Sequence, residues 1–163
     1  MLVRLNDLTQ EIPSEGVYRR TLLKVENPKG RLTVLHHTLT EGDMTFEGRE
    51  KEYQHYLISG CCLYRGRYIH GDSAIFVPAS SRFGETPLHR IRHAGEGELR
   101  ILTAIYEQGK SSFRWAKAKT RNLYETTTSY SGMTANKLFT EEEHAVMGLG
   151  GCTISICRHT HRA

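Results

Sequence analysis

The sequence predicts an all-β domain, either a sandwich or a barrel. Residues 31–107 contain six or seven short segments of apolar or alternating character, with turn residues every eight to twelve positions. No stretch in this range shows the periodicity of an amphipathic helix. Regularly spaced short strands without intervening helices are typical of sandwiches and barrels. The length of 163 residues suits one such domain.

The individual strands are identified by β-branched and apolar residues followed by Gly or Pro. The first one alternates and is followed by Gly42, and the last one is the most apolar. Arg65 and Gly66 stand near the turn of a short hairpin. In chain order, the expected strands and hairpin cover residues 31–42, 53–60, 61–72, 73–78, 88–97 and 99–107.

The segments on either side of this barrel differ from it. Residues 1–30 are polar and turn-rich, with IPSEG and ENPKG as turn signals. Residues 108–163 begin as a polar, basic arm in which Thr140 is placed to cap a short helical turn. Residues 148–163 read as a new strand, which could pair within the domain, pair with another subunit or begin a second barrel.

The composition argues against several classes of function. The net charge is +4, and the basic residues are scattered apart from residues 114–121, a run that is usually a solvated face. Nucleic-acid binding is therefore not expected. The first residues lack the apolar core of a signal peptide, and no apolar run could span a membrane, so a cytoplasmic location is expected. Reduced thiols are expected at Cys61, Cys62, Cys152 and Cys157.

The stretch GDSAIFVPASSRFGETPLHRIRHAGEGELRIL carries a family resemblance. Gly71 and Asp72 precede a short apolar strand that ends at Pro78, and His89 opens the next strand. His93 follows in that strand, ahead of a glycine-containing turn and a second apolar strand. This order resembles the second motif of the cupin superfamily, whose members are small jelly-roll barrels. The resemblance implies a cupin-like jelly roll, with His89 in the place of the family's motif histidine.

Upstream, the stretch EGREKEYQHYLISG resembles a degenerate first cupin motif, in which two histidines and a glutamate should precede a glycine. Gly60 keeps the glycine place, Tyr53 falls on the glutamate place, and Arg49 and Glu47 fall near the histidine places. A one-residue bulge would bring Glu52 into the glutamate place. The N-terminal, metal-poor barrel of bicupins such as ureidoglycine aminohydrolases is similar in this respect. That likeness implies that the arm leads toward a second barrel.

The same resemblance implies a candidate metal site. His55 shares a strand face with Tyr53, and His89 shares one with His93. Two imidazoles and the carboxylate of Glu47 would suit a divalent transition metal such as Mn, Fe, Ni or Zn, with open positions for a substrate. The predicted metal ligands are Glu47, His55 and His89, and the predicted pocket residues are Glu52, Tyr53 and His93. The competing interpretation is that these are polar side chains with hydrogen-bond partners inside the barrel.

Two further histidine groups deserve an interpretation. His36 and His37 are adjacent and lie on opposite faces of one strand, so at most one of them faces the barrel interior. Cys157, His159 and His161 would share one face of a terminal strand, but such a row spans too far for a single tetrahedral ion. The sequence contains no nucleophile elbow, phosphate-binding glycine loop or dinucleotide fingerprint.

Two hypotheses about function follow. In the first, the protein is a metal-dependent cupin enzyme of aminohydrolase, dioxygenase or isomerase type that acts on a small polar metabolite. In the second, the barrel holds no metal and serves as a small-ligand-binding or dimerisation module. The degenerate first motif favours the second hypothesis, whereas His89 keeps the first open. A homodimer is expected because related barrels pair through their sheets.

Overall fold

The computed structural model describes residues 4–28, 30–79, 88–108 and 119–122, together with the backbone of three short strands at residues 128–130, 133–137 and 155–158. Within this part of the chain, nearly every element is a β-strand. The exception is η1, a 3-10 turn at Leu5–Asp7. No helix among the described residues is long and apolar enough to cross a membrane.

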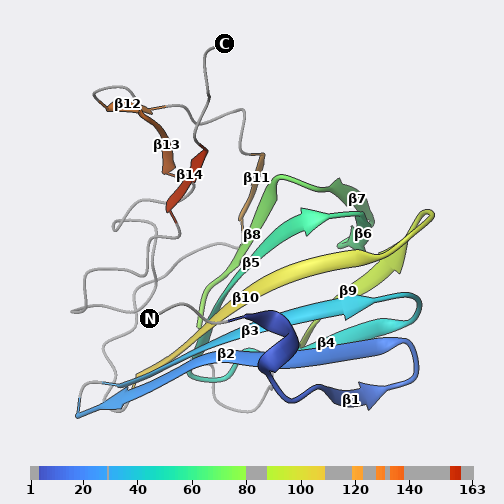
Figure 1. Ribbon diagram of the computed structural model, residues 1–163, viewed down its shortest axis with the longest axis horizontal. Coiled ribbons are helices and arrows are strands. Elements are labelled where there is room, and N and C mark those ends of the chain that lie inside the picture. Colours follow the sequence, from blue (N-terminus) through green and yellow to red (C-terminus); the bar gives the residue numbers. More distant parts are fainter. Residues whose placement is uncertain are drawn as a thin grey trace.

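Two antiparallel sheets face each other and form the barrel (Figure 1). The large sheet has seven strands in the order β1-β2-β3-β10-β5-β8-β11, and the small sheet has four in the order β4-β9-β6-β7. The large sheet consists of β1 (Glu11–Ser14), β2 (Val17–Asn27), β3 (Gly30–Leu39), β10 (Leu99–Gln108), β5 (Lys51–Ser59), β8 (Ser73–Val77) and β11 (Lys119–Asn122). The small sheet consists of β4 (Asp43–Glu47), β9 (Leu88–Ala94), β6 (Cys61–Tyr64) and β7 (Arg67–His70).

The prediction of an all-β fold is confirmed, and the expected hairpin is present between β6 and β7. Its turn residues Arg65 and Gly66 have φ angles of 49° and 75°. Positive φ at both positions is the geometry of the type I′ turn that matches the twist of two paired strands.

Two expectations about strands need correction. Residues 1–30 were expected to be a turn-rich segment, but β2 runs the length of β3 as part of the large sheet. An irregularity between Thr21 and Leu23 shifts the register and so hides the two-residue alternation that would have revealed the strand. Glu47 was expected in a loop, but it is the last residue of β4, which pairs with β9.

The C-terminal arm contributes strands of its own. β11 pairs with β8 at the edge of the large sheet, although a polar arm was expected there. A third sheet is formed by β12 (Thr128–Tyr130), β13 (Met133–Lys137) and β14 (Ser155–Arg158). Because β14 pairs with β13, its pairing is within this chain. The helical turn expected at Thr140 lies outside the described residues.

The core fills the space between the inner faces of the two sheets. Leu57, Ile75 and Ile101 come from the large sheet and are fully buried, as is Ile91 from the small sheet. Burial of each such side chain contributes about 1.5–3 kcal/mol relative to an exposed one. These packed apolar side chains hold the inward-facing polar side chains of the same strands in defined positions.

Candidate functional site

Strand β5 brings the candidate residues to the barrel interior by simple alternation. Tyr53 and Leu57 belong to the core, and His55, between them on the same face, is completely buried. Glu52 and Gln54 are also buried but point to the opposite face of the sheet. Only one of the two predicted pocket residues on this strand, Tyr53, is therefore on the inner face.

Three buried histidines and one threonine form a hydrogen-bonded row inside the barrel. Nε2 of His55 lies 2.9 Å from Nε2 of His89, and Nδ1 of His55 lies 3.0 Å from Oγ1 of Thr103. Oγ1 of Thr103 lies 3.3 Å from Nδ1 of His37. The four side chains come from β9, β5, β10 and β3, so the hydrogen-bonded row crosses from the small sheet into the large one.

Aromatic rings enclose this histidine row. Phe46 lies 5.0 Å from His89 in a stacked arrangement, 4.7 Å from His55 and 5.9 Å from His37, measured between ring centroids. Tyr53 stacks on His55 at 5.7 Å, and its hydroxyl donates a hydrogen bond of 2.5 Å to the backbone carbonyl oxygen of Glu47. The histidines are therefore in a largely apolar surrounding, apart from each other and Thr103.

Burial makes all three imidazoles neutral near neutral pH. Burial, together with the charge of Arg19, lowers the pKa of His37 to about 3. Burial and the charge of Arg65 lower the pKa of His89 to about 4. The pKa of His55 is held well below its usual range by burial and by the neighbouring His89. The row is thus a chain of neutral hydrogen-bonding groups rather than a cationic cluster.

The burial of Tyr53 acts in the opposite direction on its phenol. Burial, followed by the charges of Glu107 and Glu47, raises the pKa of this hydroxyl above its ordinary value. The group therefore stays protonated and serves as a hydrogen-bond donor to the Glu47 carbonyl.

The histidine row has two proton arrangements in which every donor points the same way along the row. In one, His89 donates to His55, His55 donates to Thr103 and the hydroxyl donates to His37; in the other, every donor and acceptor role is reversed. Each neutral imidazole carries one proton, so the direction at His89 sets the direction at His55, whereas the Thr103 oxygen can also accept from both of the histidines beside it. In both arrangements Nδ1 of His89 is buried and has no partner among the described residues.

The predicted metal ligands are only partly brought together. His55 and His89 converge, as their Nε2 atoms show. The side chain of Glu47 is exposed, while its backbone carbonyl accepts from Tyr53. Glu52 points away from the interior, and Nε2 of His93 donates to the carbonyl of Gly97 at 2.7 Å.

The described residues do not make a complete metal site. Among them, no group of three His, Cys, Asp or Glu side chains is placed to hold an ion. His55 and His89 supply two nitrogens, but the Thr103 hydroxyl and the Tyr53 phenol on the same inner face are weak ligands and already hydrogen bonded. The predicted ligand set of Glu47, His55 and His89 is therefore not assembled, because Glu47 ends β4 on the outside.

A second unpartnered group lies on the small sheet, on the strand next to the one that carries His89. Tyr64 is 4% exposed, and its hydroxyl is buried without a partner among the described side chains. It follows Cys62 and Leu63, which pair with β9, so continuation of this register brings it opposite Ile91 on the inner face. Arg65 places its guanidinium 5.5 Å from the centre of the Tyr64 ring.

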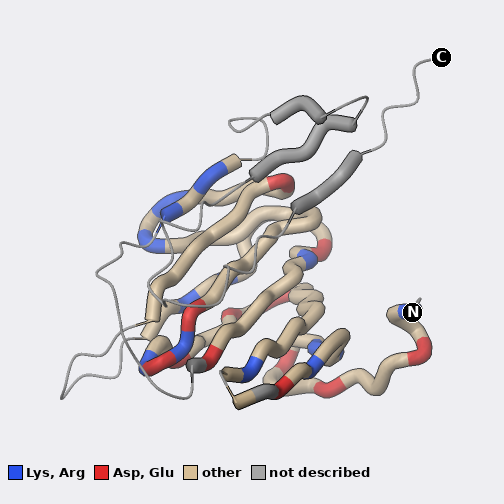
Figure 2. Tube along the Cα trace, turned by 90° about the vertical axis from the view of Figure 1, so that its left-hand side faces the viewer, with Lys and Arg blue, Asp and Glu red and all other residues tan. Residues whose placement is uncertain are grey.

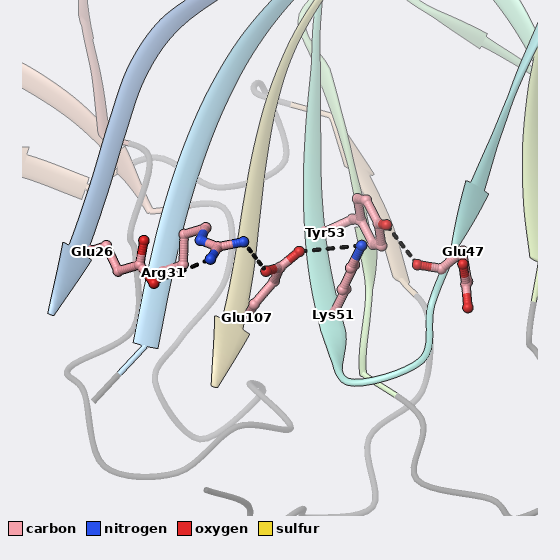
Figure 3. Close-up of polar contacts among 6 residues, drawn as sticks. All are labelled: Glu26, Arg31, Glu47, Lys51, Tyr53 and Glu107. Carbon is pink, nitrogen blue, oxygen red and sulfur yellow. Dashed lines mark hydrogen bonds and ion pairs between the residues drawn. The ribbon is translucent and has the colours of Figure 1, made fainter. Parts of the chain in front are cut away.

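Charged side chains border the site at one end of the barrel (Figure 3). Glu26, Arg31, Glu107 and Lys51 follow one another across four adjacent strands, with N–O distances of 3.1, 3.2 and 3.2 Å. Figure 2 shows acidic and basic residues alternating along this lower edge of the sheet. Because these groups are partly exposed, solvent screens each pair, and the row adds little to stability.

Sequence reasoning missed several members of the site. His37 was one of two alternatives for an inward-facing histidine, and the structure selects it over His36. Thr103 and Phe46 were not singled out. A signal for Thr103 was available, because it is a polar residue in the most apolar strand, whereas Phe46 lay in a segment expected to be a loop.

Comparison with known proteins is informative about the fold alone. No protein-family model matches the sequence, and no curated protein matches it either. Among solved structures, a predicted oxalate decarboxylase from Thermotoga maritima is 21% identical, with a TM-score of 0.54 over 66% of this chain and 99% of that chain. The polyketide cyclase RemF from Streptomyces resistomycificus is 14% identical, with a TM-score of 0.50 over 69% of this chain and 87% of that chain. The predicted cupin fold is confirmed by these similarities.

Proposed function

We propose that this cupin-fold barrel binds a small polar metabolite at His89 and Tyr64, without requiring a resident metal. The observation that carries the proposal is Nδ1 of His89, which is buried and unpartnered while Nε2 of the same ring is held by His55. Buried polar groups without partners are rare and costly, and a ligand that supplies the partner removes that cost.

The surrounding residues indicate what kind of ligand would fit. The Tyr64 hydroxyl is a second buried group that lacks a partner, and the Arg65 guanidinium acts on His89 through its charge. A ligand with a hydroxyl or amide for His89 and an oxygen acceptor for Tyr64 would satisfy both. Phe46 and Tyr53 supply apolar ring faces against which its carbon atoms can pack.

The histidine row also gives the site a possible chemical role. If the ligand gives a proton to Nδ1 of His89, each member of the row passes its own proton on, and His37 ends as a transient imidazolium whose low pKa drives the proton back. The row then returns a proton to the ligand by the same route. This supports proton transfer on a bound ligand, without identifying the reaction.

The second candidate function is a metal-dependent enzyme. The specific observation in its favour is the 2.9 Å separation of the His55 and His89 nitrogens. Two imidazoles bound to one ion at about 2.0–2.1 Å come to a similar separation when they occupy neighbouring coordination positions. In this function the two histidines would hold the ion, and the substrate would have to complete its ligands.

Ligand binding can be tested by thermal denaturation of the full chain in the presence of a set of small polar metabolites. A hit should raise the Tm of the wild type, and this rise should be lost in His89→Ala and reduced in Tyr64→Phe. His70 is exposed on β7, so His70→Ala is the matched control and should retain the response. Equal stabilisation of His89→Ala and the wild type by every hit would refute the proposed site.

Elemental analysis of the untagged protein separates the two candidates. The metal-free proposal expects no Mn, Fe, Ni or Zn at close to one ion per chain. A stoichiometric metal that disappears in His89→Ala would instead support the metal-dependent enzyme and would require that the donor set be completed by groups other than Glu47.

A further inference from the structure

The outer face of the large sheet carries an unexplained pair of polar side chains. His36 comes directly before His37 in β3, so its side chain points away from the histidine row inside the barrel. It is nevertheless only 7% exposed, and its Nδ1 atom is buried without a partner among the described residues. A histidine in such a place calls for an explanation other than packing.

Arg20 stands next to His36 on the neighbouring strand. The two residues are direct partners in the register of β2 and β3, so their side chains lie side by side on one face. Arg20 is half-buried, and its Nε atom is buried without a partner among the described residues. The structure gives it no ion pair within the part of the chain that it describes, in contrast to Arg19, which pairs with Glu11.

The charge around this pair is positive. Arg100 lies on β10, diagonally across from His36. The direct partner of His36 on this strand is Leu102, two residues after Arg100 and on the same face. Burial, followed by the charges of Arg20 and Arg100, lowers the pKa of His36. Arg100 has its own counter-ion in Glu98, at 2.7 Å, so among the described residues the uncompensated charge belongs to Arg20.

We infer that Arg20 and His36 form a binding site for a small oxyanion, a phosphate or carboxylate group, on the outer face of the large sheet. A guanidinium presents a planar set of N–H donors to the oxygens of such a group. A neutral His36 with its proton on Nδ1 adds one further donor without adding charge. One cation and one neutral donor suit a ligand group of single negative charge. The site is separate from the barrel interior, and the inference does not depend on the function proposed for that interior.

The test is an anion titration of the full chain followed by thermal denaturation. Inorganic phosphate and acetate are added in parallel, each against sodium chloride at the same ionic strength and at pH 6.5. Phosphate should raise the Tm above the chloride reference, and the apparent affinity should fall at least tenfold in Arg20→Gln and in His36→Gln. A matching response to acetate would extend the site to carboxylates, whereas a response to phosphate alone would restrict it to phosphoryl groups.

A matched control is available on the opposite sheet. Arg90 is exposed and lies 3.6 Å from Asp43, so Arg90→Gln removes the same charge at a different place and should leave phosphate binding unchanged. In addition, the imidazole ¹⁵N signals assigned by their loss in His36→Gln should shift on addition of phosphate. The inference is overturned if neither phosphate nor acetate does more than chloride, if Arg20→Gln responds like the wild type, or if the His36 signals do not move with either anion.

Discussion

Acidification should destabilise the protein in a pH range where carboxylates contribute little. His37, His55 and His89 are neutral in the folded barrel because burial lowers the pKa of each, to about 3 for His37 and about 4 for His89. In the unfolded chain their pKa returns to about 6.5. The unfolded state therefore binds more protons than the folded state below pH 6.5, and the stability of the fold decreases as the pH is lowered.

The expected loss follows from these values. Between pH 7 and pH 5 the proton uptake of each histidine on unfolding rises from about a quarter of a proton to nearly one, which costs about 2 kcal/mol of folding free energy per group. Three such groups lower the free energy of unfolding by about 5–6 kcal/mol, a large part of the 5–15 kcal/mol that is typical of a domain. The stability is fully present above about pH 7 and is lost progressively toward the folded-state pKa values.

Urea unfolding monitored by circular dichroism, at half-unit steps from pH 7.5 to pH 5, measures this directly. The slope of the unfolding free energy against pH near pH 5.5 should correspond to about two to four protons, because the lowered pKa of His36 adds to the contribution of the three barrel histidines. In His89→Leu the slope should fall by about one proton, whereas His70→Ala, which removes an exposed histidine, should change it little. A wild-type slope of less than one proton would show that the three imidazoles are not held neutral by burial, and the reasoning would fail.

The remaining predictions concern single groups. Thr103→Val keeps the shape of the side chain but leaves ring nitrogens of His55 and His37 unpaired, so the free energy of unfolding should fall by about 2–4 kcal/mol. A loss below 0.5 kcal/mol, on the same urea assay, would contradict the hydrogen-bonded row. Gly60→Ala should destabilise by about 2 kcal/mol or more, because Gly60 has a φ of 86° and its added Cβ would meet the carbonyl oxygen of Glu98 at 2.5 Å; an unchanged Tm would refute the close approach. Prolonged dialysis against EDTA should leave the Tm unchanged, and a fall of several degrees that zinc or manganese reverses would favour the metal-dependent alternative.

Much of the barrel could be predicted because its strands have strong local signals. The strands at residues 53–60, 73–78 and 99–107 are short, apolar and closed by turn residues, so each could be recognised without its neighbours. Strand β2 could not be recognised in this way, because the irregularity near Leu23 interrupts its alternation of polar and apolar residues. Strand β4 could not because it gains its hydrogen bonds from β9, which is more than forty residues away in the sequence.

The candidate site shows the same division. His55 and His89 were both named from the sequence, and the structure brings them into direct contact. Glu47 and His93 were named with them but take part in other contacts, because their positions depend on where β4 ends and how the turn after β9 folds. Thr103 joined the site only through the pairing of β10 with β3 and β5.

The sequence by itself predicted an all-β sandwich or barrel, since strand periodicity and turn residues act locally along the chain. Its resemblance to the cupin second motif implied a jelly roll with His55 and His89 on inward faces. The tertiary structure alone decided what those histidines meet. Strand register placed the ring of Phe46, the Thr103 hydroxyl and His37 around them and left the Glu47 carboxylate outside. Because register joins residues that are far apart in the sequence, no local pattern could distinguish a metal site from a row of neutral histidines.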